Sequence, residues 1–362
     1  MIQTVLDQFL KLVYASRPVE FEELQTVAGH VVSAAEVVSE DERNHAIAQM
    51  TDAILASSPM RCAMVSLTCG ALVEQGAHPK LAVDHIRTRL GEMLGLGAVF
   101  AQTCIDRAKE DGHFQDDAYT PEQAVSDYAD QVASGMPDKA GAYAAIDILC
   151  RPMIAMASRS MVALQGAQED GLLMSRLKKF PVMLPMLDWL NQLLTVLIDE
   201  PLIVLHPGLK RGYAVRINGV VGNFQLFTLL EDALIGDERQ GWLPGHKPPV
   251  HVVESVRRQV ADPPSASIQF NYANWQALKS DGTLDVYDAK PFWIWGEGKP
   301  ADIHKFDGVR VMLLSEPPYT RMFSMTAPFA GLTAQLTIDS ILSDEQVEEW
   351  LMRIAARHGQ SA

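Results

Sequence analysis

The sequence predicts an α+β protein: an all-helical N-terminal half, as a bundle or short solenoid, followed by a C-terminal domain with a mixed or antiparallel sheet and a few helices. Three observations lead to this fold class. Apolar residues recur at intervals of three and four as far as about residue 198, which is typical of amphipathic helices. After Pro201 the apolar period changes to two, which is typical of strands. Short polar turns then separate several strand-like segments, and such turns join antiparallel neighbours.

The change of period also predicts the domain boundary. We expect a helical domain over residues 1–198 and an α/β-mixed domain, ending in a helix, over residues 199–362. A chain of 362 residues is longer than the roughly 250 to 300 residues at which a single core stops growing, so two domains are expected.

The helices of the first half are separated by cap and break signals. Ser39 followed by three acidic residues indicates a helix start, and Ser58-Pro59 indicates another. Pro152 lies inside a long apolar segment, where we expect a kink or a break. No repeat holds beyond one helix pair, so a bundle and a solenoid both stay open. The expected helices cover about residues 5–16, 20–38, 40–56, 59–76, 79–110, 121–133, 142–164 and 185–198.

The second half reads as short strands with a few helices. We expect helices over 224–235 and from Ser343 to about His358, where Ser343 is a cap with acidic residues behind it. Gly236 to Pro249 is a turn-rich loop. The expected strands are 202–205, 212–217, 267–272, 283–287, 292–295, 309–314, 322–325 and 332–338.

The acidic net charge of the chain disfavours some classes of binding partner. The formal net charge is −15 at pH 7, and no run of Lys and Arg could neutralise several phosphates at once. Nucleic acid is therefore not an expected partner, and anionic membranes are disfavoured for the same reason. The charge is uneven: residues 1–200 hold 27 acidic and 15 basic side chains, and residues 201–362 hold 18 and 15. An acidic helical face could attract a basic protein segment, although it also serves solubility.

The compartment predicted from the sequence is the cytoplasm. The first 20 residues lack the apolar core and cleavage site of a signal peptide. Charged residues and prolines interrupt the longest apolar stretch, 180–205, so it does not read as a membrane span. The four cysteines form no CxxC pair and are expected to be buried, reduced thiols: Cys62, Cys69, Cys104 and Cys150.

No local catalytic signature is present. The chain has no phosphate loop, dinucleotide fingerprint, HExxH zinc motif, serine elbow or EF-hand loop, which removes the commonest nucleotide-binding, metallohydrolase and α/β-hydrolase readings. The sequence therefore identifies no cofactor, and we assign no metal site.

Weaker clusters occur in the second half. Asp302 and His304 would share one side of an extended segment, as an acid/base pair or a metal site needs, but ordinary loop polarity explains them too. His251 and Glu254 have helical spacing, which is also that of a solvated pair. His206, Lys210 and Arg211 share one loop and could hold an anion, or could simply be solvated.

An aromatic segment, Phe292-Trp293-Ile294-Trp295, leads into Gly296-Glu297-Gly298. If the strand geometry persists, Trp295 and Glu297 point to one face and could line a pocket with one polar anchor. Aromatic residues on a sheet also serve as core.

Two hypotheses follow. The first is a non-catalytic interaction protein, adaptor or regulatory, which binds a protein partner; it is preferred because it asks less of the residues. The second is an enzyme or small-ligand binder with a site in the C-terminal half or at the junction of the halves. Its expected ligand-binding residues are Arg211, Arg216, Trp295, Glu297 and His304. The oligomeric state stays open.

Overall fold

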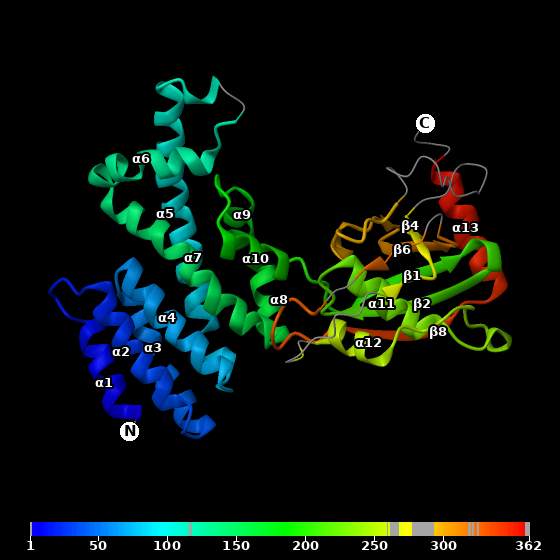
Figure 1. Cartoon of the computed structure of the whole chain (residues 1–362), viewed down its shortest axis with the longest axis horizontal. Coiled ribbons are helices and arrows are strands. Elements are labelled where there is room, and N and C mark those ends of the chain that lie inside the picture. The colour runs from blue at the N-terminus through cyan, green and yellow to red at the C-terminus, as the bar shows by residue number, and fades with distance from the viewer. Residues whose placement is uncertain are drawn as a thin grey trace. The chain divides into compact units, whose positions relative to one another are not determined.

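The structure is a computed structural model that describes residues 2–115, 118–258, 260, 268–276, 293–317, 320, 322–323 and 326–358. The chain divides into two compact units, Met1–Leu194 and Thr195–Ala362, which we call the helical unit and the sheet unit. This is the α+β organisation that the sequence predicts, with helices first and a mixed sheet second (Figure 1). A boundary at residue 198 between independently folding domains stays a prediction.

The helical unit consists of α-helices joined by short turns and two 3-10 turns, and Figure 1 shows them from blue to green. Its helices are α1 (Ile2–Val13), α2 (Phe21–Ala35), α3 (Glu40–Ala56), α4 (Pro59–Glu74), α5 (Val83–Glu110), α6 (Pro121–Gly135), α7 (Pro137–Ser158), α8 (Met161–Glu169), α9 (Gly171–Lys178) and α10 (Pro185–Leu193).

Cap residues fix several of these helix starts. The Ser39 hydroxyl accepts a hydrogen bond from the Glu42 N–H at 3.3 Å, and the Glu42 carboxylate accepts one from the Ser39 N–H at 3.0 Å. Thr120 and Gln123 make the same reciprocal pair at the start of α6. Each pair satisfies two N–H groups that the first helical turn leaves open.

α7 is the central helix of this unit and packs against α4, α5 and α10. Its close approach to α4 depends on Gly70, because a Cβ there would lie 2.8 Å from Pro152 Cβ. The predicted helical stretch 142–164, with a kink or break at Pro152, differs from the structure, because the interruption comes later: α7 ends at Ser158, and α8 begins at Met161. Pro152 lies inside α7 without ending it.

α7 is long and apolar enough to cross a membrane, judged by length and composition alone. In its most apolar window, 56% of the residues are buried inside the helical unit, as in the core helix of a water-soluble protein. The other apolar stretch, 180–205, is divided between α10 and a strand of the sheet unit.

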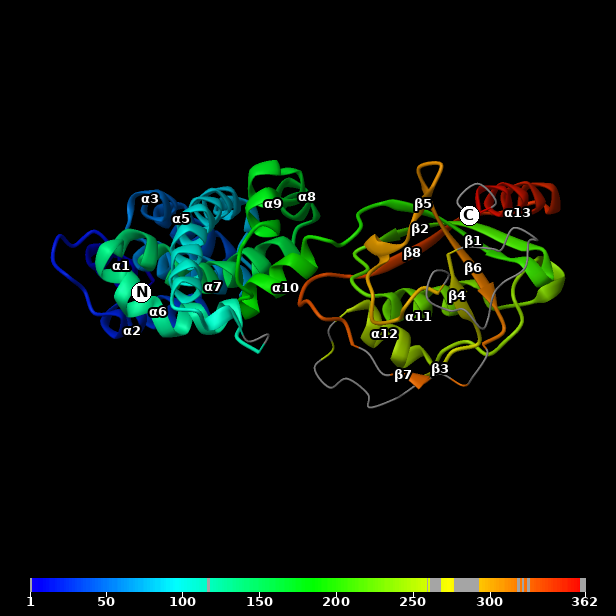
Figure 2. The same ribbon diagram turned by 90° about the horizontal axis from the view of Figure 1, so that it is seen from above.

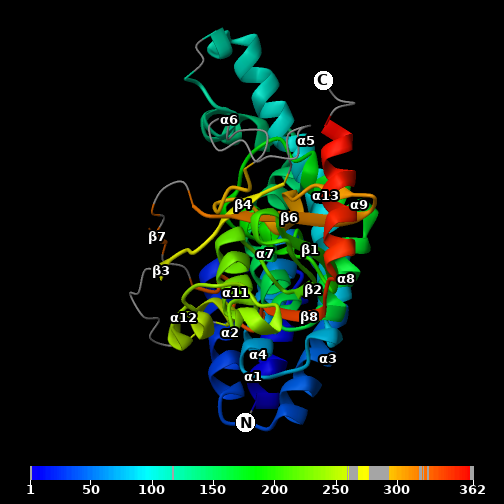
Figure 3. The same cartoon turned by 90° about the vertical axis from the view of Figure 1, so that its right-hand side faces the viewer.

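The sheet unit contains a mixed six-stranded sheet and a separate two-stranded ribbon. The larger sheet has the order β4-β6-β1-β2-β8, which can be followed down Figure 3, and β5 pairs with β6. β1 and β6 run parallel, whereas β2 is antiparallel to both β1 and β8. The strands are β1 (Glu200–His206), β2 (Arg211–Asn218), β3 (Ile268–Gln269), β4 (Ala273–Trp275), β5 (Lys305–Phe306), β6 (Val309–Ser315), β7 (Met322–Phe323) and β8 (Gln335–Ile341).

Helices cover the two faces of the larger sheet. Figure 2 shows α11 (Asn223–Leu234) and α12 (Val250–Arg257) on one face and α13 (Asp344–His358) on the other. The α11 face carries the larger core, which includes Leu202, Val204, Val215, Ile217 and Met312. The α13 face carries a smaller core around Ile203, Leu205, Trp275, Leu313 and Val347.

Several predicted strands differ from the structure. Trp293 forms only an isolated bridge with Trp275, so the predicted strand 292–295 does not extend to Trp295. The last predicted strand, 332–338, begins instead at Gln335 and continues to Ile341. The predicted strand 283–287, Phe292, Ser267 and residues 324–325 lie outside the described residues.

Candidate functional site

The two arginines predicted as ligand-binding residues point to opposite faces of β2. Arg216 lies five positions after Arg211, which is about 17 Å along a strand, and the odd spacing turns their side chains to different sides. Arg211 lies near the Glu238 carbonyl, with 3.4 Å from Nη2 to O. Arg216 lies 3.2 Å from Asp339 and 3.5 Å from Asp199. The strand therefore keeps them out of one common anion site.

Trp295 and Glu297 lie in a turn that holds the start of α11. The Asn223 N–H donates to the Gly298 carbonyl at 3.0 Å, and the Phe224 N–H donates to the Gly296 carbonyl at 3.1 Å. Asn223 Nδ2 donates to the Trp295 carbonyl at 2.7 Å. These bonds replace a side-chain cap, which Gly222 at the N-cap position cannot provide. The extended geometry expected for this segment ends here, and both side chains are exposed.

His304 is exposed and lies between the short turn Pro300–Asp302 and β5. The Asp302 carboxylate accepts the Lys299 N–H at 3.2 Å, which makes it part of the cap of that turn. Within the described residues, no group of three or more His, Cys, Asp and Glu side chains could hold a metal ion. A ligand-binding role for His304, Trp295, Glu297 and the two arginines stays a prediction.

Of the other residues named from the sequence, Glu254, His206 and Lys210 each have a partner within the sheet unit. Glu254 lies 3.1 Å from Arg258, and His251 is exposed on α12. His206 is buried, and its Nδ1 accepts the Leu209 N–H at 3.2 Å. Lys210 lies 2.8 Å from Glu348 of α13.

The most strongly perturbed carboxyl group that the structure describes is a residue the sequence analysis did not single out. Glu231 of α11 is 4% exposed. Its Oε1 accepts the N–H groups of Asn271 at 2.6 Å and Tyr272 at 3.1 Å, and its Oε2 accepts Asn271 Nδ2 at 2.7 Å. Burial raises the pKa of Glu231 to about 7, although these hydrogen bonds favour the ionised form and act against that rise.

Other titratable side chains lie on the same face of the sheet. The Tyr272 ring packs edge-on against His206 at 5.5 Å between centroids, and its hydroxyl donates to the Pro244 carbonyl. Burial is the largest of the causes that raise the pKa of Tyr272, and the nearby charge of Glu231 raises it further. Burial lowers the pKa of His206. Three side chains with shifted pKa values, Glu231, Tyr272 and His206, thus lie together in an apolar environment. Such groups often mark functional sites, so this region has to be tested as one.

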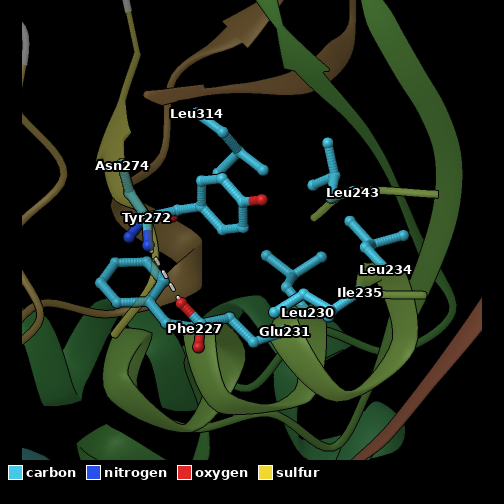
Figure 4. A pocket seen from close by; sticks show the side chains of 9 residues that line it. All are labelled: Phe227, Leu230, Glu231, Leu234, Ile235, Leu243, Tyr272, Asn274 and Leu314. Carbon is cyan, nitrogen blue, oxygen red and sulfur yellow. Dashed lines mark hydrogen bonds between the residues drawn. The ribbon is translucent and has the colours of Figure 1, made fainter. Parts of the chain in front are cut away.

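The space beside Glu231 is too small for a metabolite. Figure 4 shows the side chains that line it, with the Tyr272 ring across the space and the Glu231 carboxylate beside it. The cavity has a volume of about 10 Å³, which is close to what a single water needs. Small-molecule sites have about 300 to 1,000 Å³. In this conformation Glu231 therefore acts within the fold, where it fixes residues 271–272 to α11.

The sequence does hold a signal for Glu231. Its positions relative to Phe227, Leu230 and Leu234 place it on the apolar stripe of α11, where an acidic residue needs a buried partner. That partner, Asn271, is 40 residues away along the chain, so the bond itself has no local pattern.

A different surface feature remains once these clusters are placed. Among the residues that the structure describes, β8 pairs with β2 alone and forms an edge of the larger sheet. The strand has seven residues, of which Leu336 and Ile338 are half-buried and the others exposed. Leu336 and Ile338 pack against the core on the α11 face. An edge strand presents unpaired N–H and C=O groups, which can pair with another chain.

The β8 edge carries few of the features that usually protect an edge. It contains no Lys, Arg or Pro, and its one charged residue, Asp339, lies 3.2 Å from Arg216 of β2. A register shift after Ile338 leaves Asp339 unpaired with β2, which is a bulge. Residues Gln335 to Ile338, before the bulge, pair regularly with β2. Their outer edge has no feature that prevents pairing with another strand.

Comparison with known proteins finds no similar chain: no protein-family model matches, and neither a curated protein nor a solved structure does. The function therefore has to follow from the chemistry of the residues themselves.

Proposed function

We propose that this chain is a non-catalytic interaction protein, and that an extended segment of a partner polypeptide adds to its sheet at β8. The observation that carries the proposal is the seven-residue edge, which pairs on one side only in the described structure. In strand addition, main-chain hydrogen bonds supply affinity, and the alternating side chains supply specificity.

The side chains of β8 support such pairing. A partner strand would cover Leu336 and Ile338 on the α11 face, where both are only half-buried. On the other face it would meet Thr337, which is exposed. The expected partner segment therefore alternates apolar and polar residues with a period of two.

The cavity beside Glu231 is too small for a metabolite, so this place in the sheet unit does not support a small-ligand site. We place the interaction in the cytoplasm, because all four cysteines are free and buried in the helical unit, and reduced thiols are normal in that compartment. The net charge of −15 argues against a nucleic acid or an anionic membrane as the partner.

Site-specific photo-crosslinking tests the proposal. We would introduce benzoylphenylalanine in place of Thr337, and in place of Thr88 as a matched exposed threonine on α5 of the helical unit. Irradiation of cells is expected to link position 337 to a polypeptide at least ten times more efficiently than position 88. Mass spectrometry of the adduct then identifies the partner segment, including any second copy of this chain.

Equal crosslinking at the two positions would contradict the proposal. So would an adduct with another protein at position 337 that an excess of unlabelled wild-type chain does not reduce, because that chain carries the same β8 edge and should compete for the partner.

A further inference from the structure

The side chains of β8 read almost the same in both directions from Thr337. Its two neighbours are the branched aliphatic residues Leu336 and Ile338. The next pair is polar, Gln335 and Asp339, and beyond them lie the small residues Ala334 and Ser340. An antiparallel partner with the same sequence would therefore meet matching chemistry at each position, and isologous contacts between identical subunits need such self-complementarity.

The faces of the sheet restrict the register of such a pair. Leu336 and Ile338 lie on the α11 face, and Thr337 lies on the opposite face. Residues that face each other across an antiparallel pair share one side of the sheet. Centring on Thr337 places Leu336 opposite Ile338 of the partner subunit, so that the apolar face continues across the junction. A slip of one residue would place Leu336 opposite Thr337 of the partner subunit and break that face.

Charge and the bulge are compatible with this register. Like charges do not meet, because Asp339 faces Gln335 of the partner subunit and already has Arg216 as its ion-pair partner. The extra residue Asp339 follows Ile338, so the three central pairs lie within the regular part of β8.

We propose that β8 of one chain pairs antiparallel with β8 of a second copy, with the twofold axis at Thr337. This inference rests on the proposed function and names the partner. A junction of one strand pair buries less surface than the roughly 1,200 Å² of a stable interface, so the dimer should depend on concentration. The mass in solution should rise from 39.8 kDa towards twice that value as the concentration increases.

Cysteine substitution tests the axis. Facing residues of an antiparallel pair have Cβ atoms about 4.5 to 5.5 Å apart, close to disulfide distance, so Thr337→Cys should form a linked dimer under mild oxidation with oxidised glutathione. The matched control is Ser340→Cys, an exposed residue of the same strand. Its two copies would lie six positions apart, or about 20 Å, in this register. The four native cysteines are buried and should not interfere.

We expect at least tenfold more linked dimer from Thr337→Cys than from Ser340→Cys on non-reducing gels. In the native protein, Thr337→Lys should abolish the concentration-dependent rise in mass, because two lysines would meet at the axis, whereas Thr88→Lys should preserve it. Equal or absent linkage in both cysteine variants, or a wild-type mass of one chain at all concentrations, would overturn the inference. The proposed function would survive that result if benzoylphenylalanine at position 337 links a different protein, and would fall with it if no protein is linked.

Discussion

The helical unit and the sheet unit bury different kinds of polar side chain. Among the described residues of the helical unit, the buried polar side chains are all hydroxyls: Ser57, Ser66, Thr68 and Ser158. Three of them donate to a carbonyl of their own helix, at 2.6 to 3.3 Å. The described part of the sheet unit buries amides, ionisable groups and hydroxyls: His206, Asn223, Gln225, Thr228, Glu231, Ser255, Asn274 and Arg310.

This difference follows from how each unit satisfies its backbone. A helix pairs most of its own N–H and C=O groups, so the faces between helices can be apolar. The sheet unit instead has irregular connections and short helices, and some of their backbone groups take buried side chains as partners. Gln225 accepts the Val221 N–H at 2.8 Å and donates to the Val256 carbonyl. Arg310 donates to the carbonyls of Ala301 and Ile303.

The largest effect should come from removing one of these buried groups. Glu231→Ala leaves three donors of Asn271 and Tyr272 without their acceptor, one in a buried and two in part-buried hydrogen bonds, and the loss of a buried partner costs about 1 to 3 kcal/mol. We expect the sheet unit to lose at least about 3 kcal/mol of unfolding free energy. Urea titration followed by tryptophan fluorescence measures it, because five of the six tryptophans lie in this unit.

The neighbouring residue of α11 provides the control. Asp232 pairs with Arg257 at 3.0 Å but is partly exposed, so Asp232→Ala should cost only about 1 kcal/mol or less. Thiol labelling follows the helical unit separately, because all four cysteines lie there and are buried. Equal losses of unfolding free energy from both substitutions would show that the hydrogen bonds of Glu231 do not stabilise the sheet unit more than an exposed ion pair does.

The helices were predictable because their signals are local. Ser39, Pro59 and Thr120 each mark a helix start within a few residues, and the structure has helices beginning at Glu40, Pro59 and Pro121. β1, β2 and β6 were predicted for the same reason, β1 and β6 as short apolar runs and β2 as a segment with an apolar period of two. The three-residue strand β4 was missed, because it is too short to show a period.

The candidate site was much less predictable, because it depends on which strand lies at the edge. The residues now assigned to β8 were in part recognised as a strand, but nothing local shows that β2 is its single neighbour in the described sheet. The shared face of Trp295 and Glu297 was expected only if the chain stayed extended, and the chain instead turns at Gly296, whose carbonyl accepts the Phe224 N–H. Both outcomes are set by contacts between residues far apart in the sequence.

The pH dependence of stability should differ between the units. Burial raises the pKa of Glu231 from 4.5 to about 7, so the folded sheet unit binds a proton more readily than the unfolded chain. The contribution of Glu231 protonation to the unfolding free energy is therefore fully present below pH 4.5 and is lost as the pH rises through 7. The loss is on the order of 3 kcal/mol. His206 has the opposite dependence, because burial lowers its pKa and its contribution is lost as the pH falls below 6.5.

Glu231→Gln separates these two effects. The variant removes the Glu231 proton and keeps His206, so the difference in unfolding free energy between wild type and variant should change between pH 5 and pH 8 in the direction given above. Thiol labelling of the helical unit should show no matching difference between the two proteins. A wild-type and variant pair whose difference is constant over this range would contradict the raised pKa.

The smallest effects should come from a matched pair of glycine substitutions, one in each unit. A Cβ at Gly296 would overlap the Phe224 ring, so Gly296→Ala should destabilise the sheet unit by about 1 to 3 kcal/mol. Gly29 lies inside α2 with nothing within 4 Å of an added Cβ, so Gly29→Ala should stabilise the helical unit by about 0.5 to 1 kcal/mol. We therefore expect changes in unfolding free energy of opposite sign, measured by fluorescence for the sheet unit and by thiol labelling for the helical unit. The sheet unit holds its irregular segments by close contacts, which an added Cβ disturbs. The exposed face of α2 has no such contact at Gly29 and gains only from the higher helix propensity of alanine. Two changes of the same sign would show that the units do not differ in this way.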